Sequence, residues 1–408
     1  MTRAIPADLD AVVVGGGPAG LAAAQRISAA GYRVVLFERS AAFGEPVRTS
    51  GGSFVRPLRR LGVPRRLWHP VTRLRVVGPE HDVRFRYRRA RMCVLDVRGL
   101  YQWLAARAAQ AGVVLMLGER VTATVMQDGV VTGVQVRGRG EVPARLVVDA
   151  SGTTGTVARA AGLRASAPRT AAGVEVEVYA PGYDQSEALL VVGDEVAPGG
   201  YGWAFPRGDG RVRLGVGLIR PDSDADLEAL LDRLVERVPA LRASCAGAQP
   251  IETHAGVMPV YDHGAVTAAG AGILVIGDAA GHGSTLLGEG IRHAIVSGRL
   301  AGEVAAAALR APGPPAAAAL QEYPTRWDAL VGRQMRIGHA INLRLSRYAD
   351  PDWSRALDAV GRISPGLVLT ALAGDLTPGF AARMLLRHPL LAMGEGRRFV
   401  RAALARLR

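Results

Sequence analysis

The chain has 408 residues, of which 49% are hydrophobic and 51 are glycine, and this length and composition are typical of a large globular α/β enzyme or of two to three domains. Its two cysteines exclude a disulfide framework and a cysteine-rich metal site. The formal net charge is +14, but every one of the 50 basic residues is arginine, so the charge indicates a coding bias rather than a nucleic-acid partner, and no mechanism that requires a lysine is open to this chain.

The first elements predicted along the chain form a strand–helix–strand unit. A β-branched run at 10–15 precedes a glycine cluster, a helical stretch at 19–30 and a second apolar run at 33–37. A helix at 99–110 and strands at 113–117, within 121–136 and at 145–148 follow. The N-terminus lacks the apolar region of a secretion signal, and no apolar run is long enough to span a bilayer. We therefore expect a cytoplasmic protein that contacts a membrane peripherally at most.

The middle of the chain has a different pattern. Apolar or alternating runs at 174–179, 188–192 and 211–219 predict an antiparallel sheet, and leucines at helical spacing in 224–242 predict one helix that covers it. A buried strand at 272–277 leads into a long alanine-rich helix at 288–309. Residues 311–319 have the composition of a linker, and the remainder is predicted as helices broken by proline and glycine.

The glycine cluster carries the first chemical signal. Residues 15–20 satisfy G-x-G-x-x-G between a strand and a helix, a setting in which the backbone can approach a pyrophosphate at the helix N-terminus. Glu38 follows at the end of the next strand, where its carboxylate can accept hydrogen bonds from ribose hydroxyls. These residues predict a dinucleotide site. Because the chain has only one such motif, we expect no separate NAD(P)H domain. We expect the electrons to come from NAD(P)H or from a separate reductant.

A second motif identifies the dinucleotide. Gly-Asp-Ala-Ala-Gly at 277–281 follows a strand, and Gly288-Glu289-Gly290 opens a helix. This pair resembles the second FAD motif of the flavoprotein hydroxylase and reductase superfamily, the p-hydroxybenzoate-hydroxylase-like proteins. The resemblance implies an FAD-binding domain of Rossmann type, similar to that of glutathione reductase. The FAD-contacting residues that the two motifs and the resemblance imply are Gly15, Gly17, Ala19, Gly20, Glu38, Arg39, Gly51, Arg98, Val121, Asp278, Gly288, Gly290 and Ile291.

An aromatic motif narrows the family. Tyr201, Trp203, Phe205 and Pro206 form Y-x-W-x-F-P, and Gly-Val-Gly follows at 215–217 after eight residues. The pattern resembles the signature of the geranylgeranyl reductase family, flavoenzymes that saturate isoprenoid C=C bonds. The three aromatic side chains are candidate catalytic residues, because they suit an apolar wall beside a flat ring system, although a strand core gives the same pattern.

Reduction of an isolated alkene also needs a proton, and the chain departs from the family where one is expected. The family has a cysteine in a loop that aligns with residues 48–53, and Ser50 occupies its place. A serine hydroxyl is a much weaker acid than a thiol, so Ser50 either takes a changed role or only shapes the loop. Ser284 and Thr285 also replace the family's Asn-Pro. His282 is the remaining candidate proton donor because of its pKa near 6.5.

Arginine is concentrated in two segments. Thirteen arginines lie between Arg56 and Arg98, and seven lie in the apolar tail from Phe380 to the C-terminus. The first group suits the steering of a prenyl diphosphate, and the tail resembles a surface helix that rests on anionic lipid. Solvated strand faces and an ordinary packed helix are equally compatible with these patterns.

The resulting prediction is an α/β flavoprotein with an inserted antiparallel-sheet substrate domain and a C-terminal helical region. The expected FAD-binding domain comprises 1–75, 95–170 and 255–320, the substrate domain 76–94 and 171–254, and the helical region 321–408. We expect an FAD-dependent reductase of a long apolar isoprenoid. Alternatives are a monooxygenase of a hydrophobic natural product and a flavoenzyme similar to lycopene cyclase; a flavin-dependent halogenase is excluded because it needs a lysine.

Overall fold

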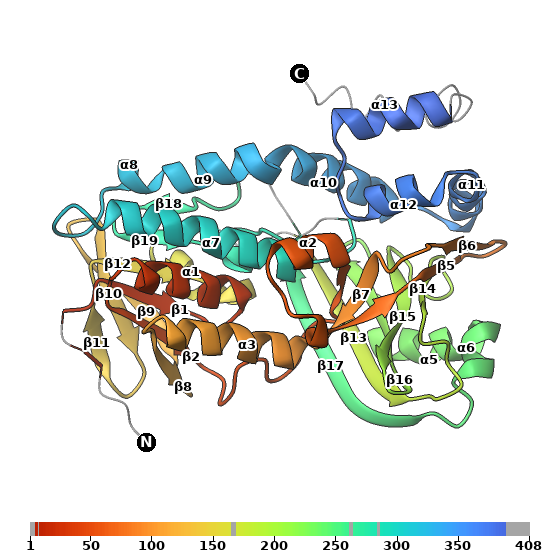
Figure 1. Ribbon diagram of the computed structural model, residues 1–408, viewed down its shortest axis with the longest axis horizontal. Helices are drawn as coiled ribbons and strands as arrows, with labels where there is room; N and C mark the ends of the chain where they lie inside the picture. The colour runs from red at the N-terminus through yellow and green to blue at the C-terminus, as the bar shows by residue number, and fades with distance from the viewer. Residues whose placement is uncertain (1–4, 7, 165–168, 261–263, 284–285, 389–408) are drawn as a thin grey trace.

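The computed structural model describes residues 5–6, 8–164, 169–260, 264–283 and 286–388. Two large sheets lie side by side along the long axis, and a layer of helices runs over both of them (Figure 1). Ser284, Thr285 and the tail beyond His388 lie outside the described residues, so the expectations for those positions stay predictions.

The first sheet contains six strands, of which five are parallel. Its order is β18-β19-β12-β1-β2-β8, and only the two-residue β18 pairs antiparallel. Continuous apolar runs form these strands because both faces of the sheet are covered. The strands are β1 (Ala11–Val14), β2 (Val34–Glu38), β8 (Val114–Leu117), β12 (Leu146–Asp149), β18 (Ala269–Gly270) and β19 (Ile273–Val275).

Different layers cover the two faces of this sheet. Helices α1 (Pro18–Ala29), α3 (Val97–Gln110) and α7 (Ile291–Ala308) share one hydrophobic core with one face, and the small sheet of β9 (Val121–Gln127), β10 (Val130–Val136) and β11 (Gly140–Pro143) packs on the other. Gly298 and Gly302 let α7 approach α1 closely, since a Cβ at either position would collide with the backbone of α1. This contact sets the start of α7 beside the glycine loop.

The second sheet contains seven strands in the order β17-β13-β16-β15-β14-β5-β6. All pairs are antiparallel except β14 with β5. The strands of this sheet run from Arg73 in β5 to Pro259 in β17, past the expected outer boundaries of the substrate domain at residues 76 and 254. The strands are β5 (Arg73–Val77), β6 (Asp82–Arg86), β13 (Thr170–Tyr179), β14 (Glu187–Val191), β15 (Gly200–Gly208), β16 (Arg211–Arg220) and β17 (Gln249–Pro259).

Two helices cover one face of the second sheet, where the sequence predicts one. Helix α5 (Leu227–Arg237) and helix α6 (Pro239–Ser244) are separated at Val238, and Leu234 and Leu241 of the pair are fully buried. The single-helix prediction is wrong because Pro239 has no backbone N–H to continue α5, whereas proline is well tolerated in the first turn of a new helix.

The opposite face of the second sheet looks toward the first sheet and the C-terminal helices. A three-stranded sheet, β3 (Gly52–Phe54), β7 (Met92–Leu95) and β4 (Trp68–Val71), packs there with α12 (Pro365–Leu372). No helix of the described chain is both long and apolar enough to cross a membrane. The remaining α-helices are α2 (Val55–Arg60), α4 (Thr156–Ala160), α8 (Ala317–Leu320), α9 (Glu322–Trp327), α10 (Arg333–Leu345), α11 (Asp350–Gly361) and α13 (Pro378–Arg387).

Candidate functional site: a cavity between the two sheets

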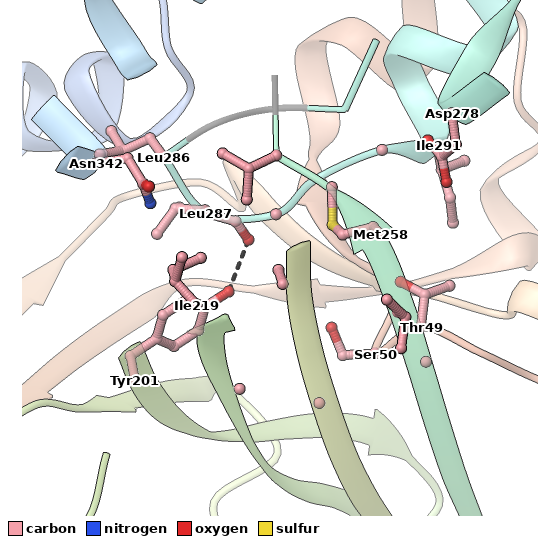
Figure 2. Close-up of a pocket in the computed structure, with 18 of the residues that line it drawn as sticks. Thr49, Ser50, Tyr201, Ile219, Met258, Asp278, Leu286, Leu287, Ile291 and Asn342 are labelled. Carbon is pink, nitrogen blue, oxygen red and sulfur yellow. Dashed lines mark hydrogen bonds between the residues drawn. The ribbon is translucent and has the colours of Figure 1, made fainter. Parts of the chain in front are cut away.

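A cavity of about 1460 Å³ extends from the glycine loop after β1, across the inner face of the second sheet, to helices α10 to α13. A single small-molecule site typically occupies roughly 300–1,000 Å³, so this space has room for a cofactor and a substrate together. In Figure 2, Thr49 and Ser50 lie on one side of the cavity, and Tyr201 and Asn342 lie on the other. Asp278 and Ile291 lie where the cavity meets the start of α7.

The three motif glycines have different structural roles. A Cβ on Gly15, whose φ is +106°, would collide with the carbonyl oxygen of Ala150, and a Cβ on Gly20 would collide with that of Gly15. These two glycines therefore permit close packing of the loop. A Cβ on Gly17 would meet nothing within 4 Å, and Gly17 borders the cavity. The open space at Gly17 fits a pyrophosphate that approaches the backbone at the start of α1.

Glu38 fits the ribose of a dinucleotide. Its Oε2 accepts a hydrogen bond from the backbone N–H of Gly16 at 2.6 Å, and its Oε1 accepts one from Ser40 at 2.8 Å. The carboxylate is therefore held in one orientation, and each oxygen keeps a lone pair for a hydroxyl donor. Ala19, Arg39 and Val121 border the same part of the cavity.

The second motif borders the same space beside the glycine loop, since a Cβ on Gly277 would lie 2.9 Å from Ala19 Cβ. Asp278, Gly288, Gly290 and Ile291 all border the cavity, and Ile291 begins the 18-residue helix α7. Burial raises the pKa of Asp278. The N-terminus of α7 carries a partial positive charge that suits an electron-rich ring edge. Together with Gly17 and Glu38, these residues fit FAD.

Two residues of the expected cofactor set, Arg98 and Gly51, are not among those that border the cavity. Arg98 lies in the first turn of α3 and forms ion pairs with Glu45 at 3.0 Å and with Glu252 at 2.9 Å. Gly51 has a φ of +76°, which permits the turn into β3. Both assignments to FAD stay predictions.

Trp203 explains why the aromatic motif ends in Gly-x-Gly. Its indole lies over Gly215 and Gly217 of the neighbouring strand, where a Cβ on Gly215 would collide with the ring. The glycines leave the ring flat on the sheet, and its Nε1 donates a hydrogen bond to Glu175 Oε2 at 2.8 Å. Trp203 borders the cavity, which fits the predicted apolar wall.

Its two aromatic neighbours have separate positions. Phe205 stacks on Trp203, with ring centroids 6.2 Å apart, and fills the space beside Gly52, but it does not border the cavity. Tyr201 borders the cavity, and its hydroxyl donates a hydrogen bond to the carbonyl of Leu287 at 2.6 Å (Figure 2). That bond ties β15 to the segment that precedes Gly288.

Replacing Tyr201 with phenylalanine removes this tie. We expect the free energy of unfolding to fall by about 1 kcal/mol and FAD to dissociate faster, because the segment that leads into α7 loses its anchor. Urea unfolding and the recovery of flavin fluorescence measure the two effects. Tyr32→Phe is the matched control, because Tyr32 donates a similar hydrogen bond to Ala306 at 3.0 Å and lies outside the cavity lining. Equal flavin release from the two variants contradicts this prediction.

The two candidate proton sources occupy different environments. Ser50 borders the cavity, and its carbonyl accepts a hydrogen bond from Arg213 at 2.7 Å, which supports a loop-shaping role. His282 does not border the cavity. Its ring stacks on Trp327 at 4.1 Å between centroids, and its Nδ1 lies 3.2 Å from both Ser297 Oγ and Tyr323 Oη.

The protonation state of His282 is a second argument against its role as the proton donor. Burial, together with the charge of His293, lowers the pKa of His282 to about 3. The imidazole is therefore neutral near pH 7 and is held inside a packed layer. The geometry favours a proton source other than His282.

The sequence reasoning missed a buried charged group on the inner face of the second sheet. Glu175, Glu177, Arg213 and His254 are all at most 4% exposed, and Glu175 and His254 border the cavity. The available signal was the presence of charged residues at alternating positions of a strand that was predicted to be buried. Each of these residues is ordinary by itself, so the signal became visible only when the strands were paired.

The arginines also lie elsewhere than expected. Arg75 and Arg84 of the first arginine group pair with Asp82 on the β5–β6 hairpin, and no arginine from 56 to 98 borders the cavity. The expected steering of a phosphate by this group is therefore not favoured. Arg333, Arg344 and Arg355, from α10 and α11, border the cavity instead.

The parallel sheet with its glycine loop and acidic strand end, joined to an antiparallel sheet across a shared cavity, defines an FAD-dependent flavoprotein. Comparisons with known proteins agree with this class. A family model described as "Lycopene cyclase protein" matches residues 10–398. A digeranylgeranylglycerophospholipid reductase of Methanopyrus kandleri is 30% identical, with 94% of this chain and 98% of the relative covered. A second reductase of that name from the same organism is 34% identical over 79% of this chain and 86% of the relative.

Solved structures share the fold. A geranylgeranyl bacteriochlorophyll reductase-like protein from Thermoplasma acidophilum superimposes with a TM-score of 0.83 at 23% identity, covering 94% of this chain and 98% of that protein. A flavin-dependent brominase superimposes with a TM-score of 0.67 at 16% identity, covering 90% and 94%. The chain belongs to the family that the lycopene cyclase model describes. Its similarity to the two reductases also places it among the geranylgeranyl reductases. The predicted family, fold class and FAD cofactor are confirmed.

Proposed function

We propose that this flavoenzyme reduces isolated C=C bonds in the isoprenoid chains of a polyprenyl lipid. The observation that carries the proposal is the shape of the cavity, which continues from the glycine loop past Trp203 into a long apolar space among the C-terminal helices. Such a space accommodates a flexible hydrocarbon chain and excludes water from the reacting bond. Its apolar lining includes Ile219, Met258, Leu286, Leu287, Ile337, Ile341, Leu345, Leu357, Val360, Ile363, Leu367, Leu372 and Leu376.

Arginines of the C-terminal helices also border the cavity, which supports a substrate with an anionic headgroup. They are Arg333, Arg344 and Arg355, and Arg355 also pairs with Asp352 at 2.6 Å. Guanidinium groups bind phosphate through paired hydrogen bonds. An apolar chain that ends in a phosphate therefore matches both the apolar lining and these arginines.

The residues near the glycine loop would hold FAD, with Gly17 next to the pyrophosphate, Glu38 on a ribose, and Asp278 and Ile291 close to the ring system. Bound and reduced, FAD supplies a hydride to an alkene carbon. Trp203 presents its ring face to the apolar chain and, since it is anchored on Glu175, orients the chain in the cavity. The electron donor is NAD(P)H or a separate reductant.

Helix α13 supports peripheral contact with a membrane. Leu386 is 82% exposed and lies between Arg383 and Arg387 in sequence, while Phe380 and Met384 of the same helix border the cavity. An exposed apolar side chain among arginines suits the surface of an anionic bilayer. A lipid substrate would then enter the cavity from the bilayer surface.

The reaction can be tested without the physiological electron donor. FAD-loaded protein, reduced anaerobically with dithionite, is mixed separately with geranylgeranyl diphosphate, menaquinone and a digeranylgeranylglycerophospholipid. Mass spectrometry is expected to show products heavier by about two mass units per reduced double bond, because each bond gains a hydride and a proton. Flavin that reoxidises on adding air while every probe keeps its mass and structure would defeat the proposal.

Cyclisation of an isoprenoid is a second candidate, because the matching family model is described as lycopene cyclase protein. A cyclase rearranges its substrate without changing its mass, so an altered chromatographic position at constant mass distinguishes it from a reductase. A gain of one oxygen in air would indicate a monooxygenase.

A further inference from the structure

The inner face of the second sheet carries one row of functional side chains. Residues paired across neighbouring strands point to the same face, and the pairing places His254 of β17 beside Glu175 of β13, with Gly215 and then Trp203 following across β16 and β15. Because Gly215 has no side chain, Trp203 reaches across it to Glu175. The row therefore joins Trp203 on β15 to His254 on β17, three strands away in the sheet.

Glu175 is the centre of this row. Its Oε2 accepts the Trp203 Nε1–H at 2.8 Å, and its Oε1 lies 2.7 Å from His254 Nδ1. Both Glu175 and His254 border the cavity although they are only 3% and 4% exposed. A buried carboxylate held by a tryptophan and a histidine beside a substrate cavity is an arrangement suited to proton transfer.

The other ring nitrogen of His254 points to a route to solvent. Its Nε2 is buried and has no aligned hydrogen-bond acceptor among the described residues, and it lies 3.4 Å from Glu252 Oε2. The side chain of Glu252 is 35% exposed, and its Oε1 pairs with Arg98 at 2.9 Å. The series of side chains Glu252, His254 and Glu175 therefore connects the protein surface to the cavity.

The surrounding charges favour the imidazolium form of His254. Burial alone lowers the pKa of His254, but its contacts with Glu175 on β13 and Glu252 on β17 outweigh burial, so the pKa is raised above its ordinary value. Arg213 on β16 opposes this shift, and Arg98 on α3 acts on Glu252 from the other side. Both ring nitrogens then carry protons, one directed to Glu175 and the other to Glu252.

We propose that Glu175 donates the proton consumed in the reduction and that His254 recharges it from solvent through Glu252. The inference rests on the proposed function. The Nδ1 proton of the His254 imidazolium first moves to the Glu175 carboxylate, which leaves His254 neutral with a proton on Nε2. The alkene gains a hydride at one carbon from the reduced cofactor; at the other carbon a C–H bond forms as the Glu175 O–H bond breaks, and the electron pair of that bond stays on the carboxylate. A proton from solvent then restores the imidazolium. Glu175 is a catalytic residue, and His254 is a positioning and relay residue.

Two variants separate these roles. Glu175→Gln keeps an oxygen that can accept the Trp203 N–H but has no transferable proton, so single-turnover reduction should fall by about 100-fold or more while FAD affinity stays unchanged. His254→Gln leaves the donor in place and should cause a smaller loss. His81→Gln is the control, since His81 lies on the β5–β6 connection and does not border the cavity; it should behave as wild type.

The pH profile gives a readout that a purely structural role would not change. A raised pKa keeps the imidazolium present to higher pH than for free histidine, so the wild-type rate should persist through neutral pH and fall as pH rises through the folded pKa of His254. This alkaline fall should disappear in His254→Gln. NMR titration of histidine-labelled protein supplies a readout independent of turnover: Glu175→Gln should lower the pKa of His254, because a neutral amide no longer stabilises the imidazolium.

The outcomes distinguish the inference from the proposed function. If the wild type reduces an isoprenoid probe and Glu175→Gln matches it in rate and pH profile, the proton source lies elsewhere while the proposed function stands. If the wild type reduces no probe, the proposed function fails and the inference fails with it. Should Glu175→Gln not fold, His254→Gln decides the matter: an unchanged alkaline limb in that variant overturns the relay.

Discussion

Trp203→Ala is expected to abolish most turnover while the protein still binds FAD. The indole covers Gly215 and Gly217 and borders the cavity, so its loss leaves a space in which the substrate chain is no longer held. Misplacement of a reacting bond by about 1 Å costs on the order of 100-fold in rate. The glycine loop and Glu38 lie on the other sheet and are unaffected. Single-turnover reduction and flavin titration measure the two properties.

Two further variants show what the tryptophan contributes. Trp203→Phe keeps an aromatic face but removes the N–H that Glu175 accepts, so we expect activity between that of alanine and wild type. Trp103→Ala deletes a half-buried indole of α3 that does not border the cavity, and it should retain turnover. Parallel loss of flavin and turnover in Trp203→Ala, with Trp103→Ala normal, would show that the aromatic cluster is structural and not part of the substrate site.

Gly17→Ala is expected to weaken FAD binding without destabilising the protein. The added methyl group meets no protein atom within 4 Å, and the φ of Gly17 is −75°, which alanine adopts without strain. The methyl group would occupy the space assigned to the pyrophosphate. Overpacking of this kind costs about 1–3 kcal/mol, which corresponds to roughly a ten- to hundredfold loss of affinity.

Gly366→Ala is the matched control for this prediction. Gly366 is exposed in α12, and its added Cβ likewise meets nothing within 4 Å. Both variants should match or slightly exceed the wild type in thermal unfolding of the FAD-free protein, because alanine restricts the unfolded chain. Only Gly17→Ala should lose affinity in a flavin titration. Wild-type affinity in Gly17→Ala would mean that the pyrophosphate lies away from this loop.

The fold was predicted best where the signal is local. The strand, glycine loop and helix around residues 11–29, and the acidic end of β2 at Glu38, lie within one residue of their expected positions. The start of α7 was less accurate: the helix begins at Ile291, because Gly288, with a φ of +66°, cannot continue a helix and belongs to the loop before it. The leucine spacing in 224–242 predicted one helix and gave no indication of the break before Pro239, although proline is itself a local signal for such a break.

The site was predicted in part. The aromatic motif and the FAD motifs were found because each occupies a short stretch with a recognisable spacing, and Tyr201 and Trp203 do border the cavity. His282 was chosen for its ordinary pKa, but that value changes once the ring is buried against Trp327. The arginine group was chosen for its number, whereas its members pair with a surface acid or lie away from the cavity.

By itself, the sequence determined the family, the cofactor and the two sheet types, because backbone turns, strand runs and spaced motifs are encoded over a few neighbouring residues. Only the tertiary structure decided which side chains share the cavity. Glu175 and His254 are 79 residues apart, and Trp203 comes from a third strand. They meet because four strands, β17, β13, β16 and β15, pair in register and the pleat directs all three side chains to the same face. Strand register depends on how the whole sheet is buried.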